Sequence, residues 1–270
     1  MRPATTTVFC ALAGEAFRDA MRRRIVPVIA VFALLSLLAV DSCTSCAGSG
    51  QVVQDGVQVS ASDISGWTGM LIFTVLSLWM MLLAGLLASD HLAETVLDGS
   101  ANLVLARPVR RSEFALARLT GALGIAYVTG AVVLTVSAYL LHLRNGVPLG
   151  AAIWAGAACA AGALVVAALA MALSLRLARV VTAMSVLFFV GAITLVDAFT
   201  LFGVSLGRLG SILQYFAPPL CTAVVVALKP WIASELSEVD PTLMALKLAF
   251  WMVASVLILL ATFQKQELGS

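Results

Sequence analysis

Residues Trp67–Ser89 read WTGMLIFTVLSLWMMLLAGLLAS, a stretch that contains no charged side chain. A helix needs about 20 apolar residues to cross a hydrocarbon core that is about 30 Å thick. Its backbone N–H and C=O groups must be satisfied within the segment, because the bilayer core offers no hydrogen-bonding partner. We therefore predict that this stretch is a transmembrane helix.

Five further apolar stretches predict an all-α membrane protein that crosses the bilayer six times. Of the 270 residues, 61% are hydrophobic and 11% are charged, whereas about 25% are charged in ordinary soluble domains. The mean hydropathy of +1.05 indicates more apolar sequence than a small soluble core can bury. The other predicted spans are Ile25–Val40, Leu119–Leu141, Leu149–Leu175, Val180–Gly203 and Leu243–Phe263.

The predicted domain organisation follows from these spans. A leader of residues 1–24 precedes a membrane domain of residues 25–263, and residues 264–270 form a short tail. Within the membrane domain, outer loops are predicted at about 41–66 and 204–242, and a long connection at about 90–118.

Basic residues gather on one side of the six spans, and cytoplasmic loops are the ones that carry an excess of Lys and Arg. On that side lie Arg2, Arg18, Arg22, Arg23, Arg24, Arg107, Arg110, Arg111, Arg118, Arg176, Arg179 and Lys265. The opposite side has only Arg144, Arg208 and Lys229, with Lys247 where the last span begins. Both termini of a multi-pass protein are thus predicted to be cytoplasmic. The net charge of +2 does not indicate a nucleic-acid partner.

The leader predicts an amphipathic helix that lies in the membrane interface. Its apolar face consists of Phe9, Leu12, Ala13, Ala16 and Phe17, and its polar face of Glu15, Arg18, Asp19 and Arg22. An ordinary basic leader is the alternative. The three arginines before an apolar run also resemble a signal peptide, but Asp41 lies two residues before Cys43 and is unfavourable for lipoprotein processing. The first span is therefore predicted to be retained.

The cytoplasmic connection Asp90–Arg118 is longer than two packed helices require, which predicts a docking element within it. Gly99 and a run of apolar residues precede Arg107 and Pro108. Because proline cannot continue a helix, this pattern predicts a short helix that ends near Pro108. A second short helix is predicted to lead into the third span. The alternative is a basic loop without a docking partner.

This connection resembles that of the type-2 ABC exporter permeases, especially the branch that includes the permease for nitrous-oxide-reductase maturation. In that family the connection reads approximately Gly-Thr-Leu-x-x-Leu-Leu-x-x-Pro-Val-x-Arg, followed by Lys. The matching residues are Gly99, Ser100, Ala101, Leu103, Val104, Leu105, Pro108, Val109 and Arg111, with Arg118 in place of the lysine. Ser100 replaces threonine, and Glu94 lies farther from the glycine than the acidic residues of the family.

The resemblance extends over nearly the whole chain and implies a permease subunit that is not itself an enzyme. It implies that a separate ATPase dimer binds ATP and Mg²⁺, and that a second permease copy completes the exporter. The implied location is the inner membrane of a bacterium, where membrane lipid surrounds the permease. An accessory periplasmic protein is a further candidate partner. The implied coupling residues are Gly99, Leu103, Leu105, Arg107, Pro108, Arg111 and Arg118. A scaffold that passes ATPase work to a periplasmic partner and a gradient-driven transporter are the alternatives; the sequence does not identify the substrate.

The outer loops contain the other candidate residues. Cys43 and Cys46 predict a disulfide, a soft-metal site or a pair of free thiols, whereas a structural zinc site would need four ligands. The apolar run Cys221–Leu228 is too short to cross the membrane. It predicts a re-entrant or interfacial outer helix, or else an ordinary outer loop. Tyr215, Phe216 and Trp231 are predicted at headgroup depth. The family resemblance implies an outer helix that begins near Pro218 and shapes an outer gate, so Tyr215 and Pro218 are candidate residues of a cavity or of this gate.

Asp197 is the most prominent charge within a predicted span, and intramembrane carboxylates are functional candidates. At about 1.5 Å per residue, it lies about 25 Å along the helix from Val180, close to the outer interface. Three roles are open for Asp197: it lines a cavity, it makes a polar contact at an outer gate, or it faces the lipid headgroups.

Enzymatic motifs in the sequence are incomplete. Gly203–Gly207 matches the G-x-S-x-G pattern of serine hydrolases. Its base is missing, because the only two histidines, His91 and His142, are predicted at opposite membrane faces and cannot share a metal ion either. No lysine follows a glycine, which excludes a P-loop.

Overall fold

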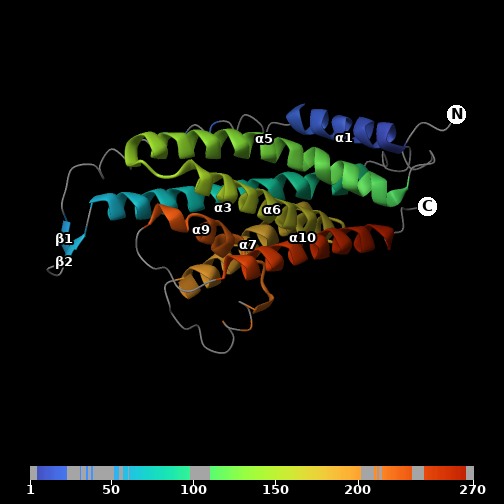
Figure 1. Cartoon of the computed structure of the whole chain (residues 1–270). Coiled ribbons are helices and arrows are strands. Elements are labelled where there is room, and N and C mark those ends of the chain that lie inside the picture. Colours follow the sequence, from blue (N-terminus) through green and yellow to red (C-terminus); the bar gives the residue numbers. More distant parts are fainter. Residues whose placement is uncertain are drawn as a thin grey trace.

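The computed structural model describes residues 5–22, 52–54, 57–59, 61–97, 110–201, 215–232 and 240–265, and the single positions 31, 35, 38, 210 and 212. This part of the chain is helical except for one short ribbon (Figure 1). Its helices are α1 (Thr5–Arg22), α3 (Ala61–Leu97), α5 (Arg111–Asn145), α6 (Leu149–Ser174), α7 (Arg179–Leu201), α9 (Leu220–Ala227) and α10 (Pro241–Gln264), with a 3₁₀ turn η1 (Lys229–Trp231).

Five of the described helices, α3, α5, α6, α7 and α10, are long and apolar enough to cross a membrane. They correspond to five of the six predicted spans, and they indicate a multi-pass membrane protein. The predicted first span, Ile25–Val40, lies outside the described residues except for Val31, Leu35 and Leu38, which are helical and exposed.

Two of the spanning helices are longer than the sequence predicted. Helix α3 has 37 residues and α5 has 35, which corresponds to about 55 Å and about 52 Å at 1.5 Å per residue. The connection between them is therefore 98–110 rather than 90–118, and the outer loop before α3 ends at residue 60. The prediction of a separate short helix before the third span is wrong. No glycine or proline interrupts Arg111–Thr120, so one helix continues through it.

The short ribbon is an exception to the all-α prediction. Strands β1 (Val52–Gln54) and β2 (Val57–Val59) pair antiparallel, with Val52 opposite Val59 and Gln54 opposite Val57. The intervening sequence is Asp-Gly, a pair that is strongly preferred in two-residue hairpin turns. This signal was present in the sequence and was missed.

Helix α6 is the central helix of the bundle and contacts α3, α5, α7, α9 and α10 (Figure 1). Small side chains allow this close packing, because they let helix backbones approach one another. Gly162 lies against Met81 of α3, and Ala167 and Ala168 are completely buried. The small residues at Gly162, Ala167 and Ala168 therefore serve helix packing.

Helix α1 packs alongside the first part of α5 (Figure 1). Ala16 is completely buried and Phe17 lies over Gly124, whereas Glu15 and Arg18 are exposed. Thr5–Arg22 therefore form a helix whose described apolar and polar side chains lie on different faces, and its position in the membrane interface stays a prediction. The structure adds that α5 covers part of the apolar face.

The contact between α1 and α5 depends on Gly121. A Cβ atom at this position would lie 2.5 Å from the Ala16 Cβ and 3.0 Å from the backbone oxygen of Ala13. We expect Gly121→Ala to lower the free energy of unfolding by about 1 kcal/mol, because overpacking outweighs the gain in helix propensity. Thermal unfolding in detergent micelles, followed by circular dichroism, measures this change.

Gly14 of α1 provides the matched control, because a Cβ atom added to it would meet nothing within 4 Å beyond its own helix backbone. Gly14→Ala is expected to raise the free energy of unfolding by up to about 1 kcal/mol through helix propensity alone. If both substitutions changed stability in the same direction, the close contact between α1 and α5 would be refuted.

Candidate functional site

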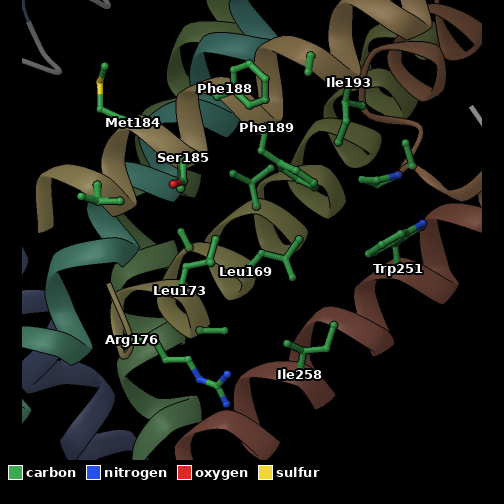
Figure 2. Close-up of a pocket in the computed structure, with 18 of the residues that line it drawn as sticks. Leu169, Leu173, Arg176, Met184, Ser185, Phe188, Phe189, Ile193, Trp251 and Ile258 are labelled. Atoms are coloured by element: carbon green, nitrogen blue, oxygen red, sulfur yellow. The ribbon is translucent and has the colours of Figure 1, made fainter. Parts of the chain in front are cut away.

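A groove of about 1130 Å³ lies between α6, α7 and α10. Figure 2 shows the side chains of Leu169 of α6, Phe189 of α7 and Ile258 of α10 directed into the space between the three helices. The groove exists because α7 and α10 both pack on α6 but hardly contact each other. Only 17% of the most apolar part of α10 is buried, compared with 56% for α6. The site therefore opens sideways, toward the surrounding lipid.

The two ends of the groove differ in chemistry. Arg176, in the turn between α6 and α7, lines one end and is the only charged residue among the lining residues of the described chain. Ala217 and Pro218, just before α9, close the other end. Among the described residues, Ser185 and Thr262 are the only uncharged polar side chains in the lining. The groove can therefore hold apolar chains over most of its length and an anionic group only near Arg176.

Asp197 of α7 caps the N-terminus of α9. Its Oδ2 atom accepts hydrogen bonds from the backbone N–H groups of Cys221 at 3.0 Å and Thr222 at 3.1 Å. The first N–H groups of a helix have no acceptor within the helix, and a carboxylate there also interacts favourably with the helix dipole. The residue that precedes α9, Pro219, provides no side-chain cap. Asp197 thus takes over this role from a neighbouring helix.

This position rules out one predicted role of Asp197. Its side chain is only 5% exposed, so the predicted exposure to headgroups is wrong. Nor does it belong to the lining of the groove. Instead it holds α9 against α7, and the electrostatic field of Lys247 from α10 also reaches it. Asp197 therefore anchors the segment whose preceding residues close the groove.

The aromatic residues of the predicted outer segment lie in different surroundings. Tyr215 and Phe216 are exposed, with their rings packed edge to face at 5.3 Å. Trp231 is buried: its Nε1 donates to the Pro148 carbonyl at 3.0 Å, and its ring lies 5.5 Å from that of Phe73. Trp231 therefore packs inside the bundle, whereas the other two rings are exposed, and its depth in the membrane stays a prediction. A short helix, α9, lies at the predicted segment, and Pro218 before it is buried; its re-entrant or interfacial placement stays a prediction.

A second cluster lies at the opposite end of the bundle and joins α1, α5 and α10. The Arg118 guanidinium is 4.0 Å from the Asp19 carboxylate and lies 5.4 Å from the centre of the Phe114 ring. Phe114 in turn stacks on Phe263, with ring centres 6.1 Å apart. Arg118 was predicted in the connection, but it belongs to α5 and is only 7% exposed. It therefore links helices within the bundle and does not present its charge to solvent.

The other predicted site residues are only partly described. Arg111 is the first residue of α5 and is exposed. His142 Nδ1 lies 2.8 Å from the Val147 carbonyl, and His91 is buried in α3. Within the described residues, no three His, Cys, Asp or Glu side chains come together as a metal site. Gly99, Leu103, Leu105, Arg107, Pro108, Cys43, Cys46 and the Gly203–Gly207 motif lie outside the described residues.

Comparison of the sequence with protein-family models and with curated proteins finds no match. Function therefore has to be inferred from the groove, from the Asp197 cap and from the helices that extend toward the 98–110 connection. The sequence indicated Asp197 and Pro218 as candidates but did not reveal the groove itself. The one sequence signal for the groove was Arg176, which in the sequence analysis served only to separate two spans.

Proposed function

We propose that the chain is the membrane-spanning permease subunit of an ABC exporter, driven by ATP hydrolysis on a separate ATPase. One observation carries the proposal: α3 and α5 continue without a break from their apolar runs through the polar stretches Asp90–Leu97 and Arg111–Arg118, and they end at the 98–110 connection. At about 55 Å and about 52 Å, both exceed the hydrocarbon thickness of about 30 Å. A rigid helix pair that projects from the membrane can convert docking at its tip into movement of the spans.

The packing of the bundle supports a mechanical route from this connection to the groove. Movement at the start of α5 would reach α1 through Arg118 and Asp19, and α10 through Phe114 and Phe263. Helix α10 forms one wall of the groove. Because the interior is closely packed, displacement of one helix has to be accommodated by its neighbours.

In this proposal, a second copy of the chain completes the membrane part, and an ATPase dimer binds ATP and Mg²⁺. Helix α1 and the end of α10 lie at the same end of the bundle (Figure 1). This agrees with two termini on one side, which the excess of basic residues predicts to be cytoplasmic, and the family resemblance implies a bacterial cell. A periplasmic accessory protein would then act on the side of α9.

The test begins with the capture of the chain from its native membranes and the identification of any P-loop ATPase that co-purifies. The complex is then reconstituted in vesicles, and substrate-stimulated ATP hydrolysis is measured. We expect the double substitution Arg107→Glu and Arg111→Glu to reduce the stimulation by about tenfold, which lies within the usual range of coupling between sites. The reason is that both arginines lie near the end of the proposed docking helix.

Arg144→Glu is the matched charge reversal at the opposite end of α5, where the side chain is exposed. It is expected to leave the stimulation unchanged. Labelling of cysteines from each side of the vesicle checks that all variants keep the same orientation. Unchanged stimulation in the double variant would contradict the assignment of the connection as the docking element. If the complex hydrolyses ATP but transports no substrate, the result would favour the alternative of a membrane scaffold that passes ATPase work to a periplasmic partner.

A gradient-driven transporter is the second candidate, because the charges of Asp197 and Lys247 interact within the bundle. Such charges are typical of ion pathways. Two backbone hydrogen bonds already occupy the Asp197 carboxylate, however. Uptake into ATP-free vesicles that an ionophore abolishes would favour this alternative over the exporter.

A further inference from the structure

We propose that the groove between α6, α7 and α10 binds one anionic phospholipid from the leaflet on the Arg176 side, with its acyl chains between the helices and its phosphate beside Arg176. This inference deepens the proposed function, on which it rests for the interpretation that the bound lipid is the transport substrate. The binding step itself requires no ATPase.

The length of the groove matches one leaflet. Its lining residues on α7 extend from Val180 to Ile193, and those on α10 from Trp251 to Thr262. At 1.5 Å per residue, these distances are about 20 Å and about 17 Å. Half of the hydrocarbon core is about 15 Å thick. A lipid whose headgroup lies at the Arg176 end can thus extend its chains along the groove as far as Pro218.

The chemistry of the lining also fits an anionic amphiphile. Apart from Ser185 and Thr262, every uncharged lining residue in the described part of the chain is apolar, and none of the described lining residues is acidic. Figure 2 shows the Arg176 side chain at the edge of the groove, directed from the end of α6 toward α10. Arginine binds phosphate through two parallel N–H donors. Basic pockets between helices on the cytoplasmic side are typical sites for anionic headgroups.

A second copy of this chain is the competing occupant of the groove. An apolar helix from such a copy would enclose the Arg176 guanidinium without a counter-ion, and burial of an unpaired charge is costly. A phosphate group neutralises the same charge. The charge at the end of the groove therefore favours the lipid over the protein helix.

Trp251, which lines the groove, provides a direct reporter of binding. The purified chain in detergent micelles is titrated with phosphatidylglycerol or phosphatidylcholine whose acyl chains are brominated, because bromine quenches tryptophan fluorescence. The signal of Trp251 is obtained by difference from Trp251→Phe. We expect phosphatidylglycerol to bind about tenfold more tightly than phosphatidylcholine, with the preference lost in Arg176→Gln.

Two matched controls separate the site from general surface effects. Arg179→Gln removes a neighbouring charge that does not line the groove, and it is expected to keep the preference. Ser185→Phe fills the groove and is expected to weaken binding of both lipids, whereas Leu187→Phe alters an exposed position of the same helix and is not. Thermal unfolding of each variant checks that it is folded.

Equal quenching by the two lipids would overturn the proposal. An equal loss of the phosphatidylglycerol preference in Arg176→Gln and in Arg179→Gln would also overturn it. Inorganic phosphate that competes as well as the lipid would show a free-anion site. A dimer that Ser185→Phe dissociates would show that a second copy occupies the groove. No ATPase is present in this lipid-binding assay. A negative result here would therefore overturn the lipid site without testing the exporter proposal. A negative result in the ATPase-stimulation experiment would overturn the exporter proposal without affecting the lipid site.

Discussion

Asp197→Ala is expected to lower the free energy of unfolding by about 2 to 5 kcal/mol, because it leaves two buried N–H groups without an acceptor. The affected donors are the backbone amides of Cys221 and Thr222. Water could replace a lost acceptor at the protein surface, but Asp197 is 5% exposed and lies between packed helices. Helix α9 is therefore expected to separate from α7 before the rest of the bundle unfolds.

Cys221 allows this local change to be measured. Its thiol is buried in the folded protein, and the chain contains five cysteines in total. With the other four replaced by alanine, the rate of maleimide labelling reports the opening of α9. Asp197→Ala is expected to increase this rate and to lower the temperature of unfolding in micelles.

Asp240 is the matched control for the Asp197 variant, because it caps α10 in the same way but is exposed. Its carboxylate accepts hydrogen bonds from the Thr242 amide at 2.9 Å and from the Thr242 hydroxyl at 2.7 Å. These bonds hold the pKa of Asp240 below its usual value, so the group is ionised at neutral pH. Solvent can replace the Asp240 carboxylate as an acceptor. Asp240→Ala should therefore lower the free energy of unfolding by less than Asp197→Ala does, and it should leave the rate of Cys221 labelling unchanged. Equal effects of the two substitutions would refute the buried cap.

The spans could be predicted from the sequence because their ends coincide with residues that break or terminate an apolar run. Helix α6 was predicted as Leu149–Leu175 and extends over Leu149–Ser174. Pro148 precedes its first residue and Arg176 follows shortly after its last. The extensions of α3 and α5 beyond the apolar region carry no such signal, because polar helical residues have the composition of a loop.

The partners of Asp197 could not be predicted, because they come from a tertiary contact. Helical rise gave the depth of the residue along α7, but Cys221 and Thr222 are 24 and 25 residues away in sequence. The groove was missed for a similar reason. It results from two helices that pack on α6 but not on each other, and no periodicity within a single helix encodes such an arrangement.

Gly85→Val is expected to lower the free energy of unfolding by about 3 kcal/mol, because it overpacks the junction of three helices. A Cβ atom on Gly85 of α3 would lie 2.7 Å from a methyl group of Val166 in α6 and 2.8 Å from one of Val186 in α7. Both valines are buried, and β-branched side chains in helices have one preferred rotamer. Neither neighbour can therefore rotate away, and the helices themselves have to move apart.

Gly191→Val introduces the same side chain in α7 at a position where an added Cβ atom would meet nothing within 4 Å beyond its own helix backbone. The change that Gly191→Val causes in the free energy of unfolding reflects helix propensity alone. The difference between the two variants therefore measures the destabilisation that comes from overpacking at Gly85. Thermal unfolding in micelles measures both, and equal losses would contradict the close packing at Gly85. A double-mutant cycle adds a sharper test. Val186→Ala alone should destabilise the protein, but combined with Gly85→Val it should restore part of the lost stability, because it removes one of the two close contacts.

The same junction connects stability to the groove, since Val166 and Val186 also line it. If Gly85→Val pushes α6 and α7 apart, the groove changes width at a point far from Arg176, and lipid affinity should fall for both headgroups alike. Arg176→Gln should instead remove only the preference for the anionic lipid. Restoration of affinity as well as stability by Val186→Ala would show that helix spacing at Gly85 sets the dimensions of the site.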